Sequence, residues 1–142
     1  MASRRKGRIL AFQALYSWDA QTKPALKIPD ELLDFSWVQP VNSVLGEEML
    51  TFSRLLVTGT IENIKAIDNM IKKHLINWEL SRLNKVDLAV LRMSVYTLMF
   101  QAEMSPSIVI DEAIGISKEY GSIDSYRFVN GILDSIRKTL AQ

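Results

Sequence analysis

The segment that most limits the possible folds is 85–103, KVDLAVLRMSVYTLMFQAE, which is apolar around most of its circumference when drawn as a helix. A helix of this kind has to be covered by other elements on nearly every side. The segment is therefore predicted to lie at the centre of the molecule. Its single polar stripe consists of Asp87, Ser94, Thr97 and Gln101.

Most of the remaining chain also has a helical period, and no stretch alternates apolar and polar residues as a half-buried strand does. The expected fold class is all-α. Further helices are predicted at 8–20, 30–38, 44–75, 106–120 and from 124 or 125 to 140, with a short turn at 78–83. A chain of 142 residues has the size of one domain, so we expect a single domain over 1–142.

Three of the six glycines lead to predictions about these helices. Gly59 indicates either a kink or a close helix crossing, because glycine costs about 1 kcal/mol against alanine inside a helix. Gly121 is expected to end the helix 106–120 in a left-handed conformation. Gly131 is predicted to mark a place where another helix passes close to the last helix.

Positive charge is concentrated at the start of the chain, in SRRKGRILAFQALY (3–16). Four of the 17 Lys and Arg residues lie there, which leaves 13 cationic against 16 acidic residues over 9–142, a net charge of −3. The four cations are Arg4, Arg5, Lys6 and Arg8. Such asymmetry is typical of a protein that meets a polyanion or a membrane surface at one end, although a solvated terminus would look the same.

The apolar run behind these cations is predicted to be neither a secretion signal nor a transmembrane helix, and an interfacial amphipathic helix stays open as an alternative. Gln13 interrupts it, and bulky Tyr16 and Trp18 and acidic Asp19 stand where a cleavage site needs small residues. The chain contains no stretch of about 18 apolar residues that could form a transmembrane helix. The first helix is thus expected to pack into the core, with one narrow polar stripe that includes Lys6 and Gln13.

Catalytic and metal chemistry has little to build on in this sequence. There is no cysteine, and His74 is the only histidine, at a lysine-flanked helix end where it is expected to cap the helix or to be solvated. No glycine-rich phosphate loop follows a strand. We therefore predict a protein that is not an enzyme, binds no cofactor and no metal, and resides in a reducing, cytoplasmic compartment.

Binding of a nucleic acid remains as a chemical possibility. Tyr120 and Phe128 flank the turn GSIDSYR, with Lys118 and Arg127 beside them. Aromatic faces stack on unpaired bases and cations contact phosphates. Either ring could instead be a core residue or a staple for a helix end.

Two stretches together resemble the NusB family of transcription antitermination factors. They are RRKGRILAFQALYSWD (4–19) and VDLAVLRMSVYTLMF followed by SPSIVIDEAIGISKEYGSIDSYRFVNGILDSI (86–136). The corresponding family patterns are a basic arm before A-x-Q-A-L-Y, the helix V-D-x-A-I-L-R, and a long block that ends in F-V-N-G-[VI]-L-D. The resemblance covers the chain except for 21–46.

This resemblance implies a compact bundle of about seven helices in two packed subdomains, here expected at 1–77 and 78–142. It also implies binding of single-stranded boxA RNA from ribosomal RNA leaders, together with the ribosomal protein NusE. RNA polymerase and other Nus factors would be indirect partners, and transcription would continue past terminators. By position, the resemblance assigns RNA contacts to Arg4, Arg5, Lys6, Arg8, Gln13, Tyr16, Tyr120, Asp124 and Phe128, and an acidic contact towards NusE to Asp87. Lys118 is added to the expected RNA contacts as a cation beside Tyr120.

Several alternatives stay open at the sequence level. The chain could be a protein–protein adaptor that docks a ribosomal protein on the stripe Asp87, Ser94, Thr97 and Gln101, with RNA held mainly by that partner. Arg92 could bridge acidic groups inside the fold or contact RNA. Ile123 stands where the family commonly has a polar or acidic residue, which could alter base preference. Self-association into a homodimer is open as well.

Overall fold

A computed structural model of the chain describes residues 3–20, 30–35 and 46–141, and within them it contains helices and no strand. This confirms the predicted all-α class. The helices are α1 (Ser3–Asp19), α2 (Asp30–Asp34), α3 (Glu47–Glu62), α4 (Ile64–Lys73), the short 3-10 helix η1 (Leu80–Arg82), α5 (Lys85–Phe100), α6 (Pro106–Tyr120) and α7 (Ser125–Leu140). The expected helix at 30–38 is described only to Phe35, and the rest of it lies outside the described residues.

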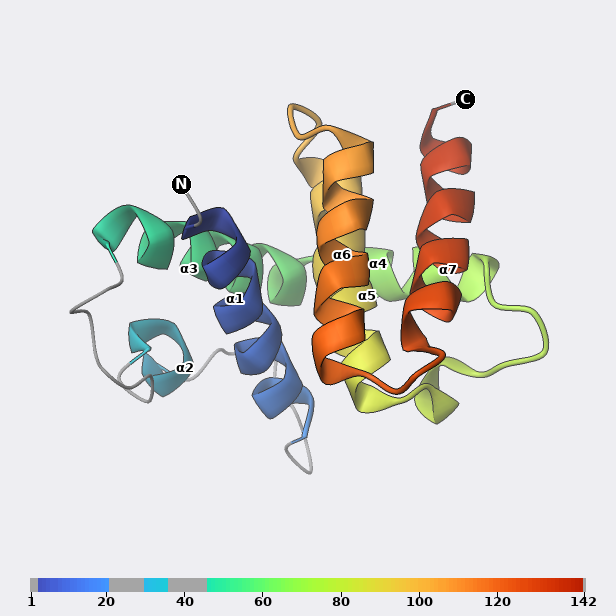
Figure 1. Cartoon of the computed structure of the whole chain (residues 1–142), viewed down its shortest axis with the longest axis horizontal. Coiled ribbons are helices and arrows are strands. Elements are labelled where there is room, and N and C mark those ends of the chain that lie inside the picture. The colour runs from blue at the N-terminus through green and yellow to red at the C-terminus, as the bar shows by residue number, and fades with distance from the viewer. Residues whose placement is uncertain (1–2, 21–29, 36–45, 142) are drawn as a thin grey trace.

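Helix α5 is the centre of the molecule, as its apolar circumference predicts. It contacts α1, α3, α4, α6 and α7, and Figure 1 shows α6 and α7 side by side, with α5 behind α6. Val90, Leu91 and Val95 of α5 are fully buried. At its start, the Asn84 side chain accepts hydrogen bonds from the backbone N–H groups of Val86 (2.8 Å) and Asp87 (3.4 Å).

Helix α1 packs against α3, with its apolar side turned into the core. Ala11, Ala14 and Leu15 are buried, and the Ser53 hydroxyl of α3 donates a hydrogen bond to the Gly7 carbonyl oxygen at 2.8 Å. The basic end of the chain is therefore the beginning of a packed helix. Its cations consequently have defined positions.

The predicted helix 44–75 is two helices, and the interruption is at Asn63 rather than at Gly59. Gly59 instead allows a close crossing with α5. A Cβ atom at Gly59 would lie 2.2 Å from the Tyr96 Cζ atom, and Tyr96 is buried. Of the two predictions for Gly59, a kink or a close helix crossing, the close crossing is correct.

The other two glycine predictions are wrong. Gly121 has φ −97°, so the end of α6 is not left-handed; a Cβ there would meet the Ser117 carbonyl oxygen at 2.7 Å and the Ser125 Oγ at 2.6 Å. Gly131 in α7 is exposed, and a Cβ would meet nothing within 4 Å. No described helix therefore passes close to Gly131.

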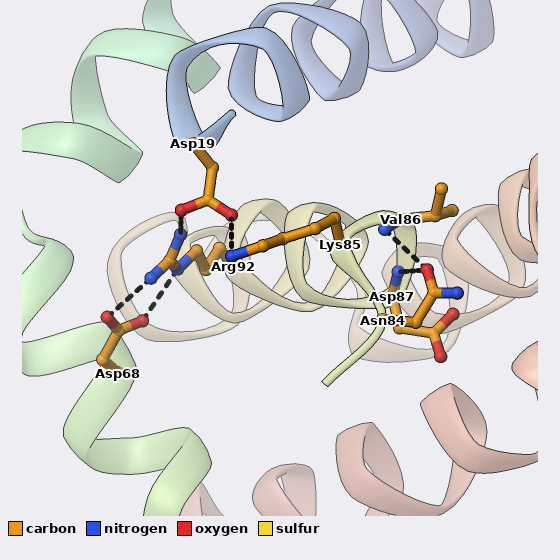
Figure 2. Close-up of polar contacts among 7 residues, drawn as sticks. All are labelled: Asp19, Asp68, Asn84, Lys85, Val86, Asp87 and Arg92. Atoms are coloured by element: carbon orange, nitrogen blue, oxygen red, sulfur yellow. Dashed lines mark hydrogen bonds and ion pairs between the residues drawn. The ribbon is translucent and has the colours of Figure 1, made fainter. Parts of the chain in front are cut away.

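Arg92 belongs to a network of ion pairs that joins three helices. Its Nε and Nη2 atoms each donate to Asp68 of α4 at 2.9 Å, and its Nη1 donates to Asp19 of α1 at 3.1 Å. Figure 2 shows Asp19 shared between Arg92 and Lys85, whose Nζ lies 3.1 Å away. Burial disfavours the charged guanidinium, but the bonds and charges of Asp68 and Asp19 outweigh it and raise the pKa of Arg92. Arg92 is thus a structural residue.

Two roles are predicted for His74, a helix cap or a solvated side chain, and it is the C-cap residue of α4. Its Nδ1 lies 2.7 Å from the Ser135 hydroxyl of α7. Within the described ranges, no helix is long and apolar enough to cross a membrane, and no group of three His, Asp or Glu residues could hold a metal ion.

Candidate nucleic-acid interface

The four cations at the start of α1 have different environments. Arg4 and Lys6 are exposed, and the Arg5 side chain is 40% exposed. The Arg8 side chain is only 7% exposed. The helical period of α1 thus turns Lys6 to solvent and Arg8 towards the interior.

Arg8 is held inside by an aromatic ring and a carboxylate. Its guanidinium carbon lies 5.4 Å from the centre of the Phe52 ring of α3, and its Nη1 lies 3.6 Å from Glu112 of α6. Burial lowers the pKa of Arg8, Glu112 opposes this, and repulsion from Arg4 adds to it. The expectation that Arg8 contacts RNA like the other three is therefore not supported, because its side chain already joins α1 to α3 and α6.

Arg4 and Arg5 lie near different neighbours. Arg4 is above the Phe52 ring at 4.9 Å, and its Nη1 lies 3.3 Å from the sulfur of Met104. Arg5 reaches towards α6, where its two terminal nitrogens lie 3.9 Å from Glu112 and from Glu119. Both guanidinium groups remain accessible to solvent in part, as a phosphate contact requires.

Three of the predicted RNA-contacting side chains share one apolar hollow on the surface. Gln13 and Tyr16 of α1 and Tyr120 of α6 line it, together with Phe12 and Val86, and its volume is about 220 Å³. The Phe12 and Tyr120 rings lie 5.3 Å apart at 51°. Tyr16 and Tyr120 are partly exposed. The fold therefore brings residues that are far apart in the sequence together at one hollow.

Tyr120 has an environment that keeps its phenol neutral. Burial of the side chain and the neighbouring Glu119 raise its pKa, and the charge of Arg5 opposes this shift. A neutral phenol offers a ring for stacking and a hydroxyl for hydrogen bonding.

Phe128 and Asp124 lie at a second hollow rather than beside Tyr120. Its volume is about 360 Å³. The lining residues are Trp78, Arg82, Leu83, Asn84, Asp87, Ser122, Asp124, Ser125 and Phe128. The sequence pair Tyr120 and Phe128 thus does not form one platform, although Val86 and Asp87, which are adjacent in α5, each line one of the two hollows.

Trp78 is a candidate residue that the sequence patterns did not single out. It is 59% exposed and lines the second hollow. It follows Asn77, whose φ of 61° is one of two positive values among the described non-glycine residues. The available signal was an aromatic residue directly after an asparagine, at the start of the predicted short turn 78–83.

Lys118 is exposed in the last turn of α6, and its Nζ lies 4.9 Å from the centre of the Tyr126 ring. Arg127 contacts the same ring at 5.6 Å. Two cations therefore contact the Tyr126 ring beside the α6–α7 turn. Ile123 in this turn is 87% exposed.

Two members of the polar stripe of α5 are buried, which corrects the expectation that Ser94 and Thr97 dock a partner, while Gln101 is half-buried and its partner contact stays a prediction. Ser94 and Thr97 are buried, and the Thr97 hydroxyl donates to the Met93 carbonyl oxygen at 3.1 Å. The Gln101 amide donates to the Tyr96 hydroxyl at 3.0 Å. These polar groups are buried or already hydrogen-bonded inside the fold. Only Asp87 among the four lines a surface hollow.

Asp87 itself is mostly buried at the start of α5. Burial raises the pKa of its carboxyl group, and a hydrogen bond with Ser125 acts in the opposite direction. A carboxylate in this position is poorly solvated, so a cationic partner would stabilise it.

Comparison with known proteins gives matches over nearly the whole chain. The model of the NusB family matches residues 5–138. A transcription antitermination protein NusB from Treponema denticola is 51% identical over 134 residues, covering 94% of this chain and 95% of that protein. The structure of T. maritima NusB superposes with a TM-score of 0.80 at 34% identity, covering 95% of this chain and 90% of that chain. A crystal structure of the antitermination factors NusB and NusE in complex with double-stranded RNA gives a TM-score of 0.80 at 27% identity, covering 98% of each chain.

Proposed function

The chain belongs to the NusB family, and on this premise we propose that it is a transcription antitermination factor that binds single-stranded boxA RNA of ribosomal RNA leaders. One observation carries the proposal. The charge of Arg5, at the basic start of α1, acts on Tyr120, which lines a hollow with Gln13 and Tyr16, so stacking surfaces and a cation are available together.

The proposed roles follow from exposure and chemistry. Arg4, Arg5 and Lys6 contact phosphates, because their charged groups are wholly or partly exposed. Tyr16 and Tyr120 stack on bases, and the Gln13 amide reads a base edge. Lys118, Asp124 and Phe128 extend the contact along the α6–α7 turn. Arg8 is left out of the RNA-contacting set, because it is buried against Phe52.

We further propose that NusE, the partner in the similar NusB and NusE structure, docks at the second hollow. Asp87 offers a poorly solvated carboxylate to a cationic group of NusE, and Trp78 offers an exposed apolar surface. Asp124 and Phe128 also line this hollow, so the proposed RNA and NusE contacts meet there. RNA polymerase and other Nus factors are then reached indirectly. This role needs no catalysis, and it locates the protein in the cytoplasm, where bacterial transcription occurs.

The organisation into two parts, 1–77 and 78–142, also stays a proposal. One buried cluster includes Leu15 and Ile67 from the first part and Leu91, Ile116 and Leu133 from the second. This shared core supports two parts of a single domain rather than two independent domains.

The phosphate contacts are tested by removing exposed charge from α1. We expect Arg4→Ala combined with Lys6→Ala to weaken binding of a boxA oligonucleotide about ten-fold or more. The salt dependence, plotted as log K against log salt, should flatten by about 0.7 for each phosphate that is no longer neutralised. Fluorescence anisotropy at several salt concentrations measures both quantities.

Lys65→Ala is the control, because Lys65 is an exposed cation on α4. It should leave affinity close to wild type. Equal affinity and equal salt slope for the double variant and the wild type would contradict RNA binding by this part of α1.

The adaptor alternative is separated by measuring RNA binding with and without NusE. We expect detectable binding by the chain alone and tighter binding with NusE. If the chain alone binds no RNA but its complex with NusE does, the chain is an adaptor. The hollow of Gln13, Tyr16 and Tyr120 is then not an RNA site.

A further inference from the structure

The guanidinium group of Arg5 lies directly over a glycine of α6. A Cβ atom on Gly115 would be 2.4 Å from Arg5 Nη1, 2.7 Å from Nη2 and 2.9 Å from Cζ. These distances are too short for any real side chain, so Arg5 can take this position only because residue 115 has none. Gly115 lies in the interior of α6, where glycine lowers helix stability relative to alanine.

Two carboxylates flank this glycine on the same face of α6. Glu112 is one turn before Gly115 and Glu119 one turn after it, and side chains at such spacings point the same way. Arg5 Nη1 lies 3.9 Å from Glu112, and Arg5 Nη2 lies 3.9 Å from Glu119. The guanidinium is therefore held between the two acids and against the bare backbone.

The same acids connect Arg5 to its surroundings. The second carboxylate oxygen of Glu112 lies 3.6 Å from the buried Arg8. Glu119 interacts with the Tyr120 hydroxyl, and the charge of Arg5 acts on Tyr120 as well. Arg5 is thus directed towards the aromatic hollow of Gln13, Tyr16 and Tyr120.

These ion pairs are loose enough to allow exchange. At 3.9 Å they are longer than charge-assisted hydrogen bonds, which measure about 2.7–2.9 Å. Partly exposed pairs of this kind contribute little stability. A phosphate can therefore replace either carboxylate on Arg5 while the guanidinium remains where α6 holds it.

We propose that Gly115 is a positioning residue for RNA binding. Because residue 115 has no side chain, the Arg5 guanidinium can lie on the backbone of α6 between Glu112 and Glu119, and this position is called the Arg5 seat. The Arg5 seat directs Arg5 to the RNA phosphate beside Tyr120. The RNA part of this inference rests on the proposed function. The seat itself is a property of the free protein.

The variant Gly115→Ala separates positioning from stability. The added methyl group displaces the flexible end of Arg5, so affinity for the boxA oligonucleotide should fall about three- to ten-fold, as expected when one partly exposed charge no longer meets its phosphate. Alanine also favours the helix, so the melting temperature should stay the same or rise. Weaker binding by an equally or more stable protein excludes unfolding as the cause.

Two controls accompany this variant. In an Arg5→Ala background, Gly115→Ala should have no further effect on affinity. Gly131→Ala makes the same change inside α7, where a Cβ meets nothing within 4 Å, and should leave affinity unchanged. Wild-type affinity of Gly115→Ala, or an equal loss of affinity with and without Arg5, would overturn the inference.

A readout without RNA distinguishes failure of the seat from failure of the proposed function. The NMR signal of the Arg5 guanidinium, assigned with Arg5→Lys, should shift in Gly115→Ala and stay in place in Gly131→Ala. An unshifted Arg5 signal would show that Gly115 does not position Arg5, whatever the RNA result. A wild-type protein that binds no RNA at low salt overturns the proposed function, and with it the RNA role of Gly115, even if the signal shifts.

Discussion

At the scale of single residues, burial decides which charges are available for function. Arg8 and Lys6 are two positions apart in a basic cluster, yet Lys6 is exposed and Arg8 is packed on Phe52. Asp87 and Ser94 share a predicted stripe, yet only Asp87 lines a hollow. Charge and residue type therefore do not distinguish functional from structural side chains until their neighbours are known.

Asp87 leads to a prediction about pH. Its folded-state pKa is raised above the usual value of 3.8, mainly by burial. The folded state thus favours the protonated form, and the ionised carboxylate reduces the free energy of unfolding at neutral pH. Asp87→Asn should therefore unfold at a higher denaturant concentration than wild type at neutral pH.

The gain should shrink as the pH falls through the raised pKa, and disappear below the usual value, where both states of the wild type are protonated. Urea unfolding of both proteins over a range of pH measures it. A difference that does not depend on pH would show that ionisation of Asp87 is not its source.

At the scale of elements, the helices could be predicted more reliably than their contacts. The bounds of α5, α6 and α7 follow from apolar periodicity and from the Ser105–Pro106 and Asp124 starts, all of which are local signals. Low helix propensity marks Gly59 and Gly131 equally in the sequence. Only the fold shows that Gly59 faces Tyr96 and that Gly131 faces solvent.

This difference predicts opposite effects of one substitution. Gly59→Ala places a methyl group 2.2 Å from the buried Tyr96 ring, and such overpacking costs about 1–3 kcal/mol, more than the gain of about 1 kcal/mol in helix propensity. Gly131→Ala should instead raise the free energy of unfolding by about 0.5–1 kcal/mol. Thermal unfolding monitored by circular dichroism compares the two. A Gly59→Ala protein as stable as Gly131→Ala would contradict a close α3–α5 crossing.

The candidate site depends on elements that are far apart in the chain. Its hollow combines α1 with the end of α6, and its cations contact α3 and α6. The sequence places Tyr120 and Phe128 on either side of one turn. In the fold, Tyr120 and Phe128 line different hollows, and the adjacent residues Val86 and Asp87 of α5 line one hollow each. Proximity in the sequence therefore does not show which side chains share a surface.

At the scale of the whole molecule, α5 connects both ends of the chain. It contacts α1, α3 and α4 as well as α6 and α7, and its Arg92 binds Asp19 and Asp68 on two different helices. The basic face of α1 is thus held in a fixed relation to the α6–α7 turn. The proposed RNA surface, divided between α1 and the α6–α7 turn, requires that these two parts do not separate.

Arg92→Ala tests this connection. The substitution leaves Asp68 and Asp19 poorly solvated and without their guanidinium partner, so it should lower the free energy of unfolding by about 3 kcal/mol. In an Asp68→Asn background the same substitution should cost less, because one of the stranded charges is already removed. Because α5 packs against both parts, tryptophan fluorescence and circular dichroism should report one common transition in the wild type. Two separate transitions would show that 1–77 and 78–142 unfold independently, and that their relative position does not depend on the Arg92 network.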